Sequence, residues 1–207
     1  PLGPDSQCQG DGNGNQIDDA CETDQPCEHC GPGQHWIDRC PGGVDIMPTG
    51  ALVGIALQDD CVADVSAVLA GPATIRRSAS MDDSINSPGI GDPPPHLDVI
   101  DTEILSLELT GGGMTLRAGG GNGRGGLLQR SLGAIVEDPN NSFVGRSFFE
   151  VFFEVDLGGQ FLYNLFPLRV EADVTCLPPV TTYIHVNTCI PLYDSPFGGN
   201  IRAYLTE

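Results

Sequence analysis

The stretch Phe148-Phe-Glu-Val-Phe-Phe-Glu-Val-Asp-Leu157 decides the fold class of this 207-residue chain. Apolar side chains occupy every second position, at Phe149, Val151, Phe153, Val155 and Leu157. Acidic side chains alternate with them, at Glu150, Glu154 and Asp156. Because successive side chains of a strand point to opposite faces, this alternation predicts a β-strand with one buried face. Phe148 and Phe152 fall on the outer face, which is then apolar enough to indicate an interface.

The same period of two recurs along the rest of the chain. It appears in segments 53–57, 61–69, 105–109, 170–174, 180–186 and 201–205. No segment shows a helical period over about ten residues. Roughly seven to ten short strands separated by Gly/Pro turns predict a mostly-β protein, specifically an antiparallel β-sandwich or jelly roll.

The first 48 residues have a different composition. They contain five of the eight cysteines, among Gly, Pro and Asp, with little apolar periodicity. Such a segment cannot bury a core of its own, so bridges and a bound ion must replace one. We therefore expect two units, a Cys-rich calcium-binding head or N-terminal arm over 1–48 and a jelly-roll-like β-sandwich over 49–207. Trp36, the single tryptophan, is predicted to anchor the head on the body.

A candidate calcium loop lies in the head, in the stretch Asp11-Gly-Asn-Gly-Asn-Gln-Ile-Asp-Asp-Ala-Cys-Glu22. Its oxygen donors have the spacing of a calcium-binding loop, which predicts ligation by the side chains of Asp11, Asn13, Asn15, Asp19 and Glu22 and by the carbonyl of Ile17. The loop departs from the helix–loop–helix hand, because Gln16 occupies the position of its glycine and Pro and Gly residues follow. The alternative interpretation is a solvated polar linker.

Two resemblances accompany these motifs. With Cys21 inside the loop and Cys8 just ahead of it, the segment resembles a thrombospondin type 3-like repeat, which implies an extracellular calcium site with a structural role. The motif Gly-Pro-Gly-Gln-His-Trp-Ile-Asp-Arg-Cys-Pro-Gly-Gly over 31–43, with the segments 52–55, 60–64 and 96–103, resembles a module of secreted planctomycete-type bacterial surface proteins. That resemblance implies a location and an architecture but no reaction.

The charge balance restricts the partners. Nine basic residues, all Arg, stand against 28 acidic ones, giving a net charge of −19. Such a chain repels nucleic acid and anionic lipid. No apolar run approaches the roughly 20 residues that span a bilayer. We expect a secreted protein, extracellular or at the cell surface, without membrane insertion, and interpret the start at Pro1 as a mature form whose leader has been removed.

An even number of cysteines predicts disulfides and an oxidising compartment. Cys176 and Cys189 bracket a predicted hairpin and are expected to pair, and Cys8 is expected to pair with Cys21. The partners of Cys27, Cys30, Cys40 and Cys61 stay open. Cys27, Cys30, Cys40 and His35 are an alternative zinc set, although the second Cys-x-x-Cys or His pair of such a site is missing.

Other polar motifs carry little specific chemistry. Gly121-x-Gly123-x-x-Gly126 matches a dinucleotide fingerprint but lacks the preceding parallel strand and following helix, which favours a loop. The cluster of Asp92, His96, Asp98, Asp101 and Glu103 is a candidate hydrolase site or second calcium site. Strand geometry, however, places Asp101 and Glu103 on one face and Asp98 on the other. No catalytic residue is assigned and no enzymatic activity is expected. Asn140, in Asn140-Asn-Ser142, is a candidate glycosylation site.

Two functions remain. The first is an extracellular structural protein, a calcium- and disulfide-stabilised subunit of a self-assembling surface fibre or layer, in which copies join through a terminal arm or strand. The alternative is a monomeric carbohydrate-binding, lectin-like module with glycan partners. One Trp and four Tyr are a thin supply for a sugar-binding face, which favours the first.

Overall fold

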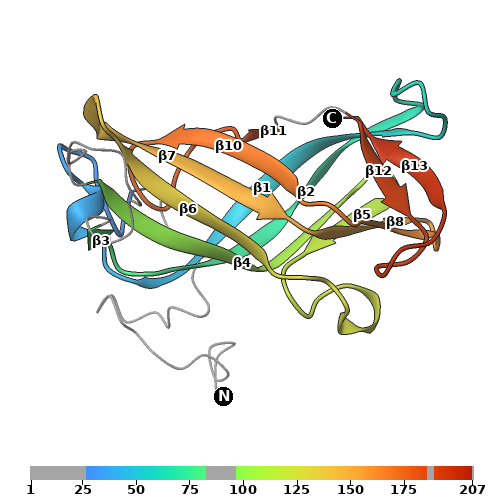
Figure 1. Ribbon diagram of the computed structural model, residues 1–207, viewed down its shortest axis with the longest axis horizontal. Helices are drawn as coiled ribbons and strands as arrows, with labels where there is room; N and C mark the ends of the chain where they lie inside the picture. Colours follow the sequence, from blue (N-terminus) through green and yellow to red (C-terminus); the bar gives the residue numbers. More distant parts are fainter. Residues whose placement is uncertain (1–26, 83–96, 186–188, 207) are drawn as a thin grey trace, which may run out of the picture.

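The computed structural model describes residues 27–82, 97–185 and 189–206 (Figure 1). The strands are β1 (Gly43–Ala56), β2 (Val65–Arg77), β3 (Met81–Asp82), β4 (Asp98–Gly111), β5 (Met114–Ala118), β6 (Ser131–Asp138), β7 (Asn141–Val151), β8 (Phe153–Leu157), β9 (Phe161–Asn164), β10 (Leu168–Val174), β11 (Ile184–His185), β12 (Ile190–Tyr193) and β13 (Ile201–Leu205). Two 3-10 turns, η3 (Ile37–Arg39) and η5 (Arg124–Gly126), are the only helical elements of this described part. The prediction of a mostly-β, antiparallel fold is confirmed.

All the strands belong to one sheet that folds over its own core. The hydrogen-bonded order is β11-β10-β7-β6-β4-β2-β1-β13-β12-β9-β8-β5, and β5 pairs in turn with β4. One edge of β4 pairs with β2, whereas the other pairs with β6 over Val99–Ile104 and with β5 over Leu107–Gly111. The sheet therefore encloses a main core that includes Leu69, Leu109, Phe153, Val155, Leu162 and Leu192.

The stretch that predicts the fold is divided between two strands at Phe152. β7 pairs with β6 and β10, and β8 pairs with β5 and β9. The Ser131 hydroxyl lies 3.0 Å from the N–H of Phe152 and 3.2 Å from its carbonyl oxygen, and can bond both. Asn164 accepts a hydrogen bond from the Phe153 N–H at 2.7 Å and donates one to the Val151 carbonyl at 2.8 Å. Two buried polar side chains thus replace the ladder bonds that are missing at the break.

The N-terminal segment from Cys27 packs against the end of the sheet. Trp36 and Ile37 are 4% and 1% exposed and join a second core cluster with Ile100, Ile135 and Val174. The predicted anchoring role of Trp36 is confirmed. β1 begins at Gly43, so residues 43–48, which the sequence assigned to the head, are part of the sheet.

The disulfides join Cys27 to Cys176, Cys30 to Cys40, and Cys61 to Cys189. The predicted Cys176–Cys189 pair is therefore wrong. Residues 27–30 of the head bond to residues 177–178, with backbone bonds from the Cys27 N–H to the Pro178 carbonyl and from the Leu177 N–H to the Cys30 carbonyl, and this places Cys27 beside Cys176. The zinc alternative is also wrong, because Cys27, Cys30 and Cys40 are consumed by disulfides. The predicted Cys8–Cys21 pair lies outside the described residues.

Asn164→Ala should lower the free energy of unfolding by about 3 kcal/mol, because it leaves buried backbone groups of Val151 and Phe153 without partners. Urea unfolding measures the change. Asn200→Ala is the matched control, since the Asn200 amide bonds only an exposed carboxylate of Asp194, and it should change stability by less than about 0.5 kcal/mol. An equal loss in both variants would contradict the role of Asn164.

Joint replacement of Cys61 and Cys189 by Ala should lower stability by about 4 kcal/mol, because the bridge closes a loop with a sequence separation of 128. Mass spectrometry of an unreduced digest should first recover the three cross-linked peptides of the described residues. Recovery of a peptide joining Cys176 to Cys189 would refute this connectivity.

Candidate functional site

The outer face of the sheet carries a cluster of two arginines around one carboxylate, here called the Arg76–Glu103–Arg130 cluster. Arg76 on β2 and Glu103 on β4 are directly opposed across the ladder, and Arg130 immediately precedes β6. Arg130 binds Glu103 through two bonds, Nε to Oε1 at 2.6 Å and Nη2 to Oε2 at 2.8 Å. Arg76 Nη2 donates to Oε2 of the same carboxylate. Fork-to-fork pairing of this kind fixes both position and orientation.

The cluster carries a positive charge. The hydrogen bonds from Arg130 hold the pKa of Glu103 below its usual range, with Arg76 acting in the same direction, although burial of the carboxyl acts the other way. Glu103 is therefore ionised near neutral pH. One carboxylate balances only one of the two guanidinium groups, so the cluster keeps one net positive charge in a chain whose total is −19.

An open hollow of about 430 Å³ adjoins the cluster. Its lining is completed by Arg77, Ser78, Asp101, Thr102, Leu132 and Gly133. The side chains of Arg76 and Arg130 are 55% and 60% exposed, so their outer edges face solvent. Asp101 is exposed beside Glu103, whereas Asp98 is in phase with the buried Ile100 and Thr102. The predicted sharing of one face by Asp101 and Glu103 is confirmed.

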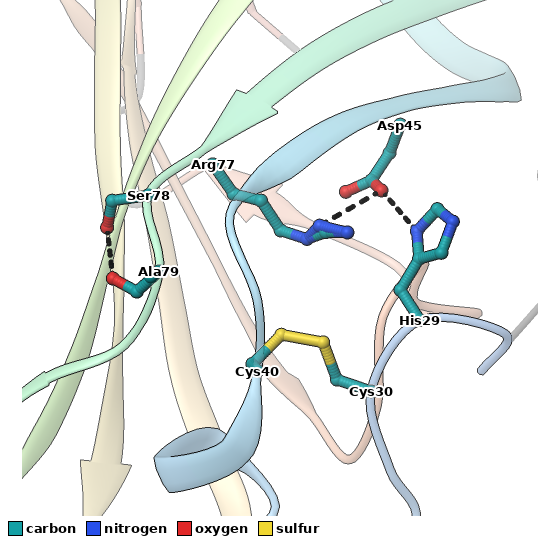
Figure 2. The surroundings of a disulfide bond; sticks show 7 residues. All are labelled: His29, Cys30, Cys40, Asp45, Arg77, Ser78 and Ala79. Carbon is teal, nitrogen blue, oxygen red and sulfur yellow. Dashed lines mark hydrogen bonds and ion pairs between the residues drawn. A yellow bond between two sulfur atoms is a disulfide. The ribbon is translucent and has the colours of Figure 1, made fainter. Parts of the chain in front are cut away.

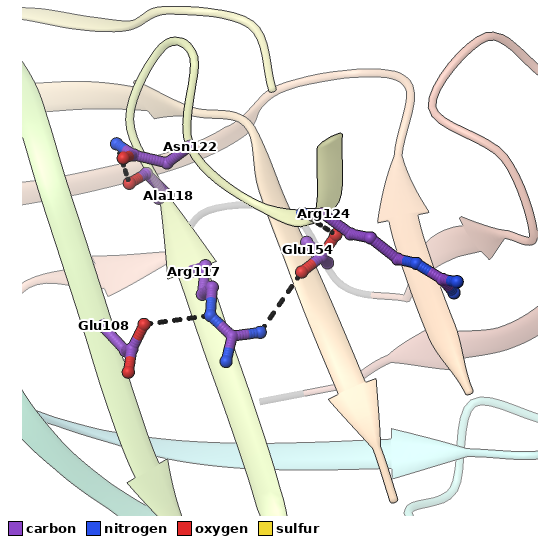
Figure 3. A network of polar contacts seen from close by, with 6 residues as sticks. All are labelled: Glu108, Arg117, Ala118, Asn122, Arg124 and Glu154. Carbon is purple, nitrogen blue, oxygen red and sulfur yellow. Dashed lines mark hydrogen bonds and ion pairs between the residues drawn. The ribbon is translucent and has the colours of Figure 1, made fainter. Parts of the chain in front are cut away.

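A second polar network lies under the glycine-rich loop between β5 and β6 (Figure 3). Glu154 is fully buried, although strand alternation predicted a solvent-facing side chain. Its carboxylate accepts hydrogen bonds from Arg117 Nη1 at 3.3 Å and from the backbone N–H of Arg124 at 2.8 Å. Burial, reinforced by the bond to Glu154, raises the pKa of Tyr163 to about 12. The glycine-rich run therefore covers a buried carboxylate; it contains the short turn η5, and β6 rather than an α-helix is the next element after it.

The third network joins the head to the sheet (Figure 2). Asp45 is 2% exposed, and its Oδ1 lies 2.7 Å from His29 Nδ1 and 3.4 Å from Arg77 Nη1. A Cβ on Gly43 would lie 2.8 Å from Arg77 Nη2, so glycine leaves room for the guanidinium. His35, of the discarded zinc set, instead has its Nδ1 2.8 Å from Glu137 Oε1. These contacts fasten the head, and no local motif signals them because the partners are distant in sequence.

Several predicted site residues cannot be placed. The calcium ligands Asp11, Asn13, Asn15, Ile17, Asp19 and Glu22 lie outside the described residues, as do Cys8, Cys21, Asp92 and His96. Within the described part, no group of three or more His, Cys, Asp or Glu side chains is arranged to hold a metal ion. Asn140 is exposed in the turn between β6 and β7, where its N–H bonds Asp138 Oδ1. No helix in the described ranges is long and apolar enough to cross a membrane.

Sequence reasoning missed the site. It placed Glu103 in a candidate hydrolase or second calcium cluster and assigned no role to Arg76 or Arg130. The missing information is the register that sets Arg76 opposite Glu103, together with the course of the loop that delivers Arg130.

Comparisons with known proteins bear on the fold. No protein-family model and no curated protein matches the chain. A solved structure, that of DynF from the dynemicin biosynthesis pathway of Micromonospora chersina, is similar with a TM-score of 0.62 and 20% sequence identity, over 86% of this chain and 81% of that one. At that identity, the likeness concerns the fold alone.

Proposed function

We propose that the chain is an extracellular structural protein, a subunit of a self-assembling surface fibre or layer. The observation that carries this proposal is the outer face of the β1–β2 hairpin, here called the hairpin face. We limit it to the outward positions Ile46, Pro48, Gly50 and Leu52 on β1 and Ser66, Val68, Ala70, Pro72 and Thr74 on β2, because the next outward pair, Val44 and Arg76, adjoins the Arg76–Glu103–Arg130 cluster. None of these side chains carries a charge. Leu52 and Val68 are opposed across the ladder, and are 57% and 73% exposed.

The net charge makes this face a favourable place for copies to meet. Subunits of charge −19 repel each other, and the repulsion is smallest where the approaching surfaces carry no charge. Burial of the exposed apolar pair adds a favourable contribution on association. The connection between β1 and β2, which projects at one end of the molecule (Figure 1), exposes Leu57 and Val62 but also Asp59, Asp60 and Asp64, so the uncharged surface is confined to the two strands.

An edge of β1 also supports contacts between copies. β13 pairs with this edge only at Ile55 and Ala56, and no strand of the described residues pairs with it between Met47 and Val53. A terminal arm of another copy would add there as an extra strand, as the sequence led us to expect. Pro48 lacks an N–H and interrupts the edge, so it limits such pairing. Face-to-face contact is therefore the main mode in this proposal.

The disulfides support the proposed location. Three bridges among the described residues favour an oxidising, extracellular environment. Calcium at the Asp11–Glu22 loop would stabilise the segment that precedes Cys27. Secretion and calcium binding are parts of the proposal.

A second candidate, a carbohydrate-binding module, is favoured by one observation. The hollow beside the Arg76–Glu103–Arg130 cluster combines charged donors, the exposed acceptor Asp101 and the apolar Leu132. Sugar sites use such mixtures, because hydroxyls both donate and accept hydrogen bonds.

Val68→Glu should weaken self-association at least about tenfold, since it buries a charge in the hairpin face. Sedimentation velocity in millimolar calcium measures the assembly. Val180→Glu introduces the same charge at a site of similar exposure, 78%, and should assemble like the parent chain. A parent chain that is monomeric throughout would refute the assembly proposal, and assembly of both variants would refute the hairpin face.

Removal of calcium with a chelator should loosen the assemblies seen by electron microscopy and lower the melting temperature. Glu22→Gln should weaken calcium binding about tenfold or more, because it removes a charged oxygen ligand. Glu171→Gln, on β10, is the control and should titrate like the parent chain. Calorimetric titration that detects no calcium binding to the parent chain would refute the calcium site.

A further inference from the structure

We propose that the hollow beside the Arg76–Glu103–Arg130 cluster binds the carboxylate of an acidic sugar, a uronic-acid residue of a glycan. This deepens the second candidate function, and does not depend on self-assembly. The inference starts from the hydrogen-bond donors that Glu103 leaves over.

A guanidinium group has five N–H donors. Among the described residues, Glu103 accepts one bond from Arg76 and two from Arg130, which leaves four donors on the first arginine and three on the second. Both side chains are more than half exposed, so these donors are accessible from the hollow. A ligand carboxylate can accept bonds from both arginines at once.

Glu103 also prepares the arginines for a ligand. It is largely buried and ionised, and it holds both guanidinium groups from below. Side chains that are already ordered lose less conformational entropy on binding. With the exposed Asp101 counted, the side-chain charges of Arg76, Arg130, Glu103 and Asp101 sum to zero, so a ligand carboxylate would be held by the remaining N–H donors of the two arginines rather than by an excess of positive charge.

The remaining lining favours a hydroxylated monoanion over other anions. Asp101 is exposed, and its carboxylate can accept bonds from sugar hydroxyls. The same charge repels a phosphate dianion or a strongly acidic peptide more strongly than it repels a single carboxylate. The Ser78 hydroxyl accepts a hydrogen bond from the Asp101 N–H at 3.0 Å. It donates one to the Ala79 carbonyl at 2.8 Å (Figure 2), and the two bonds together fix this side of the hollow. Leu132 is 46% exposed and offers an apolar surface to the C–H face of a sugar ring.

The distribution of positive charge sets this place apart. Three of the nine arginines, Arg76, Arg77 and Arg130, line one hollow. Arg77 faces inward to Asp45, which leaves the other two for a ligand. Because the whole chain repels anions, binding of an acidic glycan requires a local site of this kind.

The test is calorimetric titration of the full chain with trigalacturonate, with neutral galactotriose and with triglutamate. We expect trigalacturonate to bind at least tenfold more tightly than either of the other probes. Its affinity should fall as the salt concentration is raised. Arg130→Gln and Arg76→Gln should each raise the dissociation constant about tenfold. Arg202→Gln removes another exposed arginine, which is paired with Asp194, and should leave the dissociation constant unchanged. Asp101→Asn should retain trigalacturonate and bind triglutamate more tightly.

Each alternative result overturns the proposal. A uronic-acid site is excluded here if trigalacturonate does not bind, if galactotriose binds as tightly as trigalacturonate, or if triglutamate binds more tightly. It is also excluded if Arg202→Gln weakens binding as much as the variants of Arg76 and Arg130 do. If Arg130→Gln lowers the melting temperature so far that it does not fold, Arg76→Gln and Arg130→Lys decide, because either should still weaken binding. Neutral-glycan binding that survives all these variants would keep a carbohydrate-binding function and refute this site, whereas assembly through the hairpin face is measured separately.

Discussion

A strand that changes partners midway must still satisfy the backbone groups at the point of change. In this fold the point is Phe152, where Ser131 and Asn164 supply the bonds that neighbouring strands cannot. The break lets β7 and β8 belong to different ladders, so β6 lies toward one end of the sheet and β5 toward the other. The chain between β5 and β6 must cross this junction. Its first part covers Glu154, and its last residue, Arg130, reaches Glu103. Both polar networks therefore depend on the same break.

The charges are distributed to match this architecture. Asp45, Glu137 and Glu154 are buried acids, and each has a basic or polar partner drawn from a distant segment. An uncompensated buried charge would be strongly destabilising, so these contacts tie the segments into one arrangement. The hairpin face, in contrast, carries no charge. An acidic chain thus combines ionic contacts that position its loops with one uncharged surface.

Local pattern predicted much of the fold but little of the site. Alternation located the strands, because a half-buried strand must alternate, and it placed Asp101 and Glu103 on one face. The burial of Glu154 contradicted the pattern, since a loop rather than solvent covers that side of β8. The break at Phe152 has no local signature, because its causes are Ser131 and Asn164, on other strands. The Cys176–Cys189 pairing failed for a similar reason, since proximity in sequence carries no information about the head that packs beside Cys176.

The disulfide pattern has a mechanical consequence. Consider a chain pulled at Cys27 and at Cys189. The tension passes through the Cys27–Cys176 disulfide and then along the backbone from Cys176 to Cys189, which is itself bridged to Cys61. The shortest covalent route between these points contains roughly 13 residues of backbone, which extend to about 45 Å at most. The strands β1 to β10 lie outside that route, so traction cannot unravel them while the bridges hold. A chain bridged in this way would stretch little between these points in an oxidising medium, and would become extensible once its disulfides were reduced.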